Sequence, residues 1–424
     1  MTRLTWLKLV LLRYYRDMGL RVLLYALLSL VATLISPLVS PLLQGRVAMQ
    51  IDFASVTPVL TILASSMLAV STFSLNIMVS AHRGAADVAT PRMHRILLED
   101  TTTQSVLAAF IGAFVYSLGS IVLYRLGFYP EDAALVVMAI TTVVVILVVI
   151  SLLRWIEHLT TMGSLRDSLA SAETRAREAL KAQAENPRFG ASPLSPDTVL
   201  PLSTTPLRAP VSGYLQLIDM AAIEDCLPDH AVLYLDVAPG AHLLEGEVIG
   251  QVSGQVDDDT LSGLGRALTF GDCRTHEQDA AFGLTVLSEI AEKALSPGIN
   301  DGGTAIEALL ILKALLWEFG RTDPNPDAPK APRVFAAFPG PARFIEAAFA
   351  PTARDGAGSI ETALTLRQCL ASLSRSHDTE MSAAAQALAA NALCYAEEAG
   401  MPPRDLDRLR AIAVGAPSAQ AAAV

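Results

Sequence analysis

Four long apolar stretches dominate the first 155 residues and constrain the fold more than any other feature. They cover about 22–43, 56–79, 105–126 and 133–153. A helix that crosses a bilayer needs about 20 apolar residues, because lipid cannot satisfy an exposed backbone. The composition agrees, with 17% charged residues and 52% hydrophobic residues, against about 25% charged in ordinary soluble domains. We therefore predict a mainly α membrane protein with four transmembrane helices.

The charges divide unevenly along the chain. Residues 1–155 hold 11 Lys and Arg and 7 Asp and Glu, a net charge of +4, which leaves −15 for the remainder of the total of −11. The acidic balance argues against nucleic acid as a partner, because phosphate repels an acidic surface. Lys and Arg collect in cytoplasmic loops. They precede the first stretch and lie between the second and third, so we expect both termini in the cytoplasm of a bacterial cell, with the spans in its inner membrane.

The second stretch carries a polar stripe at helical spacing. Thr57, Thr61, Ser65, Thr72 and Asn76 fall on one face of the expected helix. Such a stripe is typical of helix packing through hydroxyl groups, or of the lining of a pore. The pore-lining candidates are Thr61, Ser65, Thr72 and Asn76. No Asp, Glu, Lys or Arg lies well inside a stretch, which argues against a proton-coupled carrier.

The remainder of the chain divides into four predicted segments after the membrane domain of residues 1–155. Residues 156–185 form a charged helix continuous with the fourth span. Its seam of His158, Met162, Leu165, Leu169, Ala172, Ala176 and Ala179 either pairs with a second copy or packs on the chain's own domain. A Pro-rich linker at 186–210 leads to a β-rich unit at 211–272 that resembles small barrel-sandwich modules.

The last predicted segment, 273–424, is a helical cytoplasmic domain. We expect helices over 278–295, 304–319, 341–350, 360–374, 383–398 and 404–412.

Two groups of residues in this domain are candidates for ligand binding. His276, Glu277 and Asp279 follow Cys273, and they indicate either capping and solvated roles or, less specifically, a metal site. Asn300, Asp301 and Thr304 open the second helix of the domain, where they either cap it or place N–H groups toward an anion. We expect no metal, no cofactor and no enzymatic activity, with a hydrolase-like site near His276 as the alternative.

Several motifs match a known family. Thr72-Phe-Ser-Leu75, Thr90-Pro-Arg92 and Phe110-Ile-Gly-Ala-Phe-Val-Tyr116 lie in or beside the second and third stretches. Downstream are Ser212-Gly-Tyr-Leu215, Asp279-Ala-Ala-Phe-Gly283 and Ala294-Leu-Ser-Pro-Gly-Ile-Asn-Asp301. Together they resemble the bacterial domain of unknown function 2254 family of predicted membrane proteins. The resemblance implies an architecture over most of the chain. The family name does not specify an activity.

The leading functional hypothesis is an oligomeric ion channel or transport pore. Four spans per chain enclose a path more readily around a symmetry axis, so we expect a homo-oligomer gated by its cytoplasmic domain. The alternative is a membrane-anchored sensor or scaffold whose acidic domain binds a small ligand, an ion or a protein. In both hypotheses the lipid bilayer is a partner.

Overall fold

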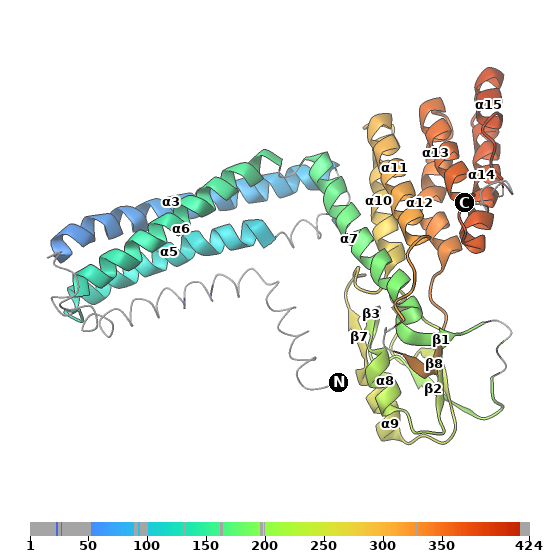
Figure 1. The fold of residues 1–424 in the computed structure, drawn as a ribbon, viewed down its shortest axis with the longest axis horizontal. Coiled ribbons are helices and arrows are strands. Elements are labelled where there is room, and N and C mark those ends of the chain that lie inside the picture. Colours follow the sequence, from blue (N-terminus) through green and yellow to red (C-terminus); the bar gives the residue numbers. More distant parts are fainter. Residues whose placement is uncertain are drawn as a thin grey trace. The chain divides into compact units, whose positions relative to one another are not determined.

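The computed structural model describes residues 23, 27, 52–88, 92–93, 101–129, 133–161, 164–195, 198, 200–326 and 330–415. The chain forms two compact units, residues 1–168 and residues 169–424. Each unit is described by itself below, and Figure 1 labels its elements. The first predicted span, 22–43, lies outside the described residues except for Leu23 and Leu27.

The first unit contains three long helices, α3 (Phe53–Val88), α5 (Thr101–Arg125) and α6 (Ala133–Thr161). Within them, Phe53–Ser80, Thr102–Arg125 and Ala134–Leu159 are long and apolar enough to cross a membrane. These segments have 24 to 28 residues. At 1.5 Å per residue they reach about 36 to 42 Å, more than a hydrocarbon core of about 30 Å. The second, third and fourth predicted spans are therefore helices of the required length.

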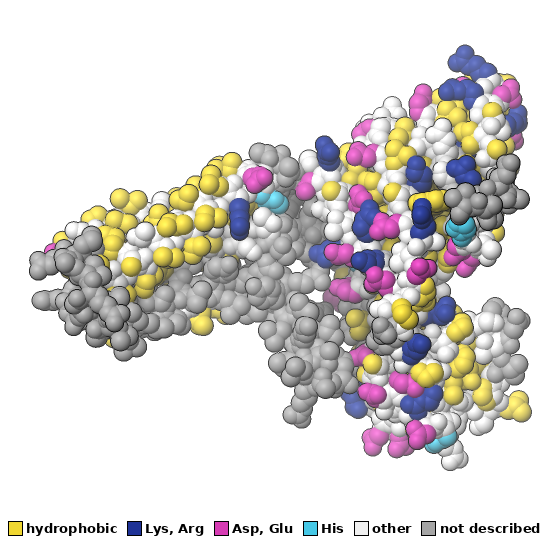
Figure 2. Space-filling model, in the orientation of Figure 1, with side chains coloured by type: hydrophobic (Ala, Val, Ile, Leu, Met, Phe, Trp, Pro, Cys, Tyr) yellow, Lys and Arg dark blue, Asp and Glu magenta, His cyan; other side chains and the backbone are white. Residues whose placement is uncertain are grey.

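The three helices share a core made from one face of each. On α3, Val56, Leu60, Leu63 and Met67 recur at helical spacing and are all buried. They join two clusters that include Phe110 and Tyr116 of α5 and Val137 and Val148 of α6. The outer surface is apolar, as Figure 2 shows for the face in view. On α6, for example, Val143, Ile146, Leu147, Leu153 and Ile156 are about half exposed or more. A surface of this composition matches lipid rather than water.

The charged helix predicted to continue the fourth span is a separate element. Helix α6 ends at Thr161, and α7 covers Leu165–Glu185. The predicted seam on α7 is buried within the chain, at Leu169, Ala172, Ala176 and Ala179. Gly283 of α10 permits the closest approach, because a Cβ there would lie 2.7 Å from the Cα of Ala176. Of the two alternatives for this seam, packing on the chain's own domain is the one that the structure adopts.

The second unit begins with two small sheets. The five-stranded sheet has the order β1-β8-β4-β6-β2, and the three-stranded sheet has the order β5-β3-β7. The strands are β1 (Ala191–Pro193), β2 (Thr204–Arg208), β3 (Gly213–Ile218), β4 (Val232–Leu235), β5 (His242–Leu243), β6 (Val248–Ser253), β7 (Leu268–Gly271) and β8 (Ala331–Ala336). Two short helices, α8 (Met220–Cys226) and α9 (Asp258–Arg266), lie between strands in the sequence.

This arrangement differs from the predicted linker and does not confirm the predicted barrel-sandwich module. The segment 186–210 is not a linker, because it provides β1 and β2 to the larger sheet. The predicted barrel-sandwich module is not confirmed either. Strand β8 comes from beyond α11 in the sequence and pairs in parallel with both β1 and β4. The sheet is therefore a mixed one assembled from segments more than 100 residues apart.

All six predicted helices of the last segment are present, within a few residues of their expected ends. They are α10 (Ala280–Leu295), α11 (Gly302–Phe319), α12 (Pro341–Asp355), α13 (Ile360–Leu373), α14 (Thr379–Glu398) and α15 (Pro403–Arg410). Helix α12 packs between α10 and α14, while α13 packs on α11, α14 and α15. Consecutive helix pairs thus stack side by side, as Figure 1 shows, in the manner of helical-repeat proteins.

Candidate functional site

The predicted pore-lining residues share one exposed face of α3. Thr61, Ser65, Thr72 and Asn76 are all exposed, and they lie on the side of the helix opposite the buried row of Val56, Leu60, Leu63 and Met67. The described parts of α5 and α6 therefore do not cover them. The structure places these four residues together on one helix face, which we call the polar face of α3.

The hydroxyl groups on the polar face bond to the helix itself. Thr61 Oγ1 donates to the Thr57 carbonyl at 2.9 Å, Ser65 Oγ to that of Thr61 at 3.0 Å, and Thr72 Oγ1 to that of Leu68 at 3.0 Å. Each hydroxyl hydrogen is thereby satisfied without a second helix. Asn76 differs, because an amide has two donor hydrogens and its side chain makes no hydrogen bond to the described residues. The polar face carries no charged side chain.

The polar face spans most of the membrane depth. The middle of the Phe53–Ser80 segment falls between residues 66 and 67. At 1.5 Å per residue, Ser65 lies about 2 Å from the middle, Thr61 and Thr72 about 8 Å, and Asn76 about 14 Å. In a span centred on the bilayer, three of the four groups would lie well inside the hydrocarbon core and Asn76 near its edge.

Asp279 of the first ligand-binding group is buried in a structural ion pair. Its side chain accepts two hydrogen bonds from Arg274, from Nε at 2.8 Å and from Nη2 at 3.0 Å. It also accepts the Phe282 N–H at 3.1 Å and so caps α10. Burial raises the pKa of Asp279 above its ordinary value, and Arg274 opposes that shift. Gly240 packs directly against the Asp279 carboxylate, since a Cβ at Gly240 would lie 2.1 Å from Asp279 Oδ2. On that side of the carboxylate there is no room for a ligand.

The other two members of this group do not converge with Asp279 on a ligand. The His276 ring packs against the Phe282 ring at 4.6 Å between centroids. The Arg274 guanidinium also lies over the Phe282 ring, at 4.8 Å from its centroid. Glu277 is exposed. In the part of the chain that the structure describes, no three His, Cys, Asp or Glu side chains are placed to hold a metal ion. The segment 274–282 therefore acts as a packed start of α10.

The second group, Asn300, Asp301 and Thr304, caps α11. The Asp301 carboxylate accepts the Thr304 N–H at 3.1 Å and the Thr304 hydroxyl at 2.6 Å. These hydrogen bonds hold the pKa of Asp301 below its ordinary value. Asn300 has a φ of 52°, in the left-handed region, and its N–H donates to the Ser296 carbonyl at 2.9 Å. The Asp301 carboxylate thus caps the start of α11, where the sequence analysis considered a bound anion as the alternative.

The two groups cannot form one site. Asp279 precedes α10 and Asp301 follows it, and this helix has 16 residues. At 1.5 Å per residue the helix separates its two ends by about 24 Å. The structure therefore gives two helix caps rather than a shared pocket.

The best-formed cavities among the described residues are small. One of the best-formed cavities has a volume of about 10 Å³, which is room for one water molecule. It lies among α12, α13, α14 and α15, with an apolar lining apart from Arg367.

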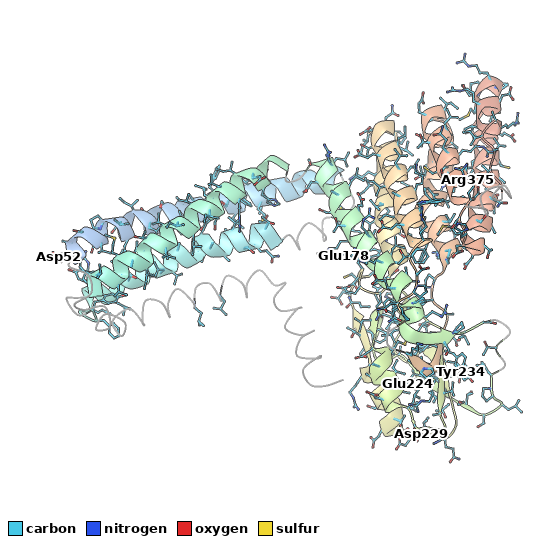
Figure 3. The ribbon with its side chains drawn as sticks, in the orientation of Figure 1. Asp52, Glu178, Glu224, Asp229, Tyr234 and Arg375 are labelled. Atoms are coloured by element: carbon cyan, nitrogen blue, oxygen red, sulfur yellow. The ribbon has the colours of Figure 1, made fainter. Side chains whose placement is uncertain are left out.

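Two structural residues were missed by the sequence analysis. Arg274 completes the Asp279 pair, and Arg333 of β8 binds the end of α8. Arg333 Nε donates to Glu224 Oε1 at 2.7 Å, and Nη1 donates to the carbonyls of Leu227 and Pro228 at 2.8 and 2.9 Å. Figure 3 labels Glu224 and Asp229 in this region. A single arginine gives no local signal, because its partner lies 109 residues earlier in the chain.

Comparison with known proteins assigns the chain to a family. A family described as predicted membrane protein (DUF2254) matches residues 16–372, well over half of the chain. The chain belongs to this family. The family description agrees with the three membrane-length helices, and the matched range includes parts of both units, with the Asp279 and Asp301 caps among them.

Relatives of the chain are found in mycobacteria. The chain is 28% identical over 273 residues to uncharacterized proteins of Mycobacterium tuberculosis, strains CDC 1551 and H37Rv, and of Mycobacterium bovis. The match covers 61% of this chain and 51% of each relative, so the chain spans about half the length of these proteins. No solved structure matches the chain.

Proposed function

We propose that the protein is a membrane-anchored scaffold whose C-terminal unit binds a protein partner on the cytoplasmic side. The supporting observation is an exposed row on α11. Glu307, Leu310, Ala314 and Trp317 recur at intervals of three and four residues, and all four are exposed. Leu310 is 44% exposed and Trp317 is 38% exposed. We call this row the α11 ridge.

The chemistry of the α11 ridge favours a protein over a small molecule. Tryptophan is among the residues that contribute most to protein interfaces, and stacked helix pairs present extended surfaces of the kind that helical-repeat proteins use for binding. The best-formed cavities among the described residues are too small to enclose a small ligand. The partner would offer an apolar pocket to Trp317 and a basic group to Glu307.

Site-specific photocrosslinking in cells tests this proposal. A photoreactive amino acid at Ala314 should give one discrete adduct with a second protein, identified by mass spectrometry, and Trp317→Ala should abolish it. The control position is Arg375, which is also exposed and belongs to the same unit but lies outside α11 (Figure 3). Equal labelling at the two positions, or adducts only between copies of this chain, would contradict a scaffold for another protein.

An oligomeric pore is the second candidate function, and the polar face of α3 favours it. In such an oligomer Thr61, Ser65, Thr72 and Asn76 would meet around an axis and line a path for ions. The full chain in liposomes would then conduct ions, and Thr72→Leu with Asn76→Leu would reduce that flux.

Thr142→Leu is the matched control for the pore. Thr142 is exposed on α6, and its hydroxyl donates to the Met138 carbonyl at 2.9 Å. Like Thr72, it is an exposed threonine bonded to the carbonyl four residues earlier, but it lies on a different helix. Flux that is absent, or that is unchanged by the α3 double substitution, would exclude these residues as a lining.

A further inference from the structure

The α11 ridge has the spacing of a seam between packed helices. Its four residues, Glu307, Leu310, Ala314 and Trp317, follow one another at intervals of three, four and three. Alternating intervals of three and four are the pattern by which one helix packs along another. Trp317 lies ten positions after Glu307, or about 15 Å along the axis at 1.5 Å per residue. The ridge is therefore long enough for about three turns of a second helix.

The ridge also has the width and the relief that helix packing requires. Ile306 and Ile311 are half-buried and flank the row on its two sides, which widens the apolar surface. Ala314 projects only a methyl group, so the ridge has a gap between the larger side chains of Leu310 and Trp317. In packed helices a gap of this kind receives a large apolar side chain from the facing helix.

An apolar outer row is not a general property of this helical domain. The neighbouring helix α13, which packs on α11, has an exposed or half-exposed row at intervals of four, three and four. The members of that row are all polar: Glu361, Thr365, Gln368 and Ser372. A polar row suits contact with water, whereas Leu310 and Trp317 of the ridge suit contact with protein.

The two ends of the ridge carry opposite charges. Glu307 is exposed at one end, and it makes no ion pair or hydrogen bond with the residues that the structure describes. At the other end the Arg321 guanidinium lies over the Trp317 ring, 5.9 Å from its centroid. Glu318, at the same end, is already ion-paired with Arg177 of α7. A partner that matches both ends has a basic group for Glu307 and an acidic group for Arg321.

We propose that the partner of the scaffold docks one amphipathic helix on the α11 ridge, antiparallel to α11. This inference rests on the scaffold proposal and adds the structure and direction of the segment that binds. Acidic side chains stabilise the start of a helix and basic side chains its end. A helix with an acid for Arg321 and a base for Glu307 therefore starts at the C-terminal end of α11. Its apolar face places a large side chain against Ala314.

Mapping both ends of photocrosslinks in cells tests the helix and its direction. The full chain carries a photoreactive amino acid in place of Glu307, Leu310 or Ala314, one at a time, with Trp317 intact. Mass spectrometry identifies the partner residue in each adduct. Positions 307 and 314 are about 10 Å apart along α11, a distance that takes seven residues of a helix but about three of a strand. From 307 to 314 the attached residue should move about seven positions toward the partner's N-terminus, with an intermediate position for 310.

The outcomes distinguish this inference from the scaffold proposal. A shift of about three positions, a shift toward the partner's C-terminus, or attachment to unconnected segments would overturn the antiparallel helix and leave a protein partner on the ridge. If none of the three positions gives an adduct with a second protein, the scaffold proposal fails and the docked helix with it.

Charge reversal tests the matched ends. Glu307→Lys should lower the yield of the adduct formed at position 314 several-fold, and an acidic substitution of the facing basic residue in the partner should restore it. The matched control is Glu398→Lys, which reverses an exposed acid of α14 in the same unit. Equal yields for the two variants would exclude a basic group opposite Glu307, and with it the assigned direction.

Discussion

The two units satisfy their polar groups in different ways. In the membrane unit the hydroxyls of Thr61, Ser65 and Thr72 bond to carbonyls of their own helix, three or four residues back. In the C-terminal unit, by contrast, some polar side chains join separate elements, as Arg333 joins β8 to α8. The exposed face of a helix in lipid meets no water, so hydroxyls there bond to their own helix, whereas the buried Tyr116 hydroxyl of α5 donates to the Val137 carbonyl of α6. In the C-terminal unit such a pair can also span a long distance in sequence, which is 109 residues for Arg333 and Glu224.

The largest effect is expected from breaking the buried ion pair of the C-terminal unit. Arg274→Ala leaves the Asp279 carboxylate, whose side chain is 2% exposed, without its cation. Removing one partner of a buried pair typically lowers the free energy of unfolding by about 3 to 5 kcal/mol. Urea unfolding of the full chain in detergent measures this change. The control is Lys181→Ala, which breaks a pair that is 62% and 45% exposed and should cost about 1 kcal/mol or less. Equal losses for the two variants would contradict the structural role of the Arg274 pair.

A smaller effect is expected where α7 crosses α10. Gly283→Ala places a Cβ 2.7 Å from both the Cα and the Cβ of Ala176, so the helices must separate. Overpacking of this kind typically costs about 1 to 3 kcal/mol. The same urea titration reports it. Gly298→Ala is the matched control, since its Cβ would meet no atom within 4 Å. A neutral Gly283→Ala would mean that α7 does not pack closely on α10.

The cap of α11 should contribute about 1 kcal/mol and depend on pH. Asp301→Ala removes an N-cap, which typically costs about 0.5 to 2 kcal/mol. Because hydrogen bonds from Thr304 lower the pKa of Asp301 in the folded state, the ionised form contributes stability above the unfolded-state pKa. That contribution declines as the pH falls through the folded-state pKa.

Asp301→Asn separates the two parts of this prediction. Asparagine caps helices nearly as well as aspartate and does not titrate. The variant should keep most of the stability at neutral pH and lose the acid-dependent part, measured by urea unfolding from neutral to acidic pH. A pH profile unchanged from that of the parent chain would assign the dependence to another group.

The smallest effect is expected in the membrane unit. Thr142→Leu removes a hydroxyl that bonds to a carbonyl of its own helix. The free energy of unfolding, measured by thermal unfolding in detergent, should therefore change by about 0.5 kcal/mol or less. Thr72→Leu provides the informative contrast. A clearly larger loss at Thr72 than at Thr142 would show that the polar face of α3 is a contact surface, whereas equal small losses would leave it facing lipid.

The candidate site residues show how far local patterns reach. The spacing of Thr61, Ser65, Thr72 and Asn76 was enough to place them on one face, because helical geometry depends only on intervals along the chain. Their exposure on the side away from α5 and α6 required the packed helices. The Asp279 and Asp301 groups were recognised as helix starts with capping as one alternative, and the caps are what the structure shows. Asp279 precedes α10 and Asp301 follows it, so the length of this helix separates the two groups.

What the sequence by itself determined is the part of the fold that local signals specify. Apolar stretches predicted α3, α5 and α6, and helical sequence patterns predicted α10 to α15, because such patterns depend on residues a few positions apart. Only the tertiary structure decided that the Pro-rich segment adds β1 and β2 to a sheet, that β8 inserts between β1 and β4, and that the α7 seam meets Gly283. Strand pairing and helix contacts join residues more than 100 positions apart, and short strands carry too little periodicity to show which of the possible partners they take.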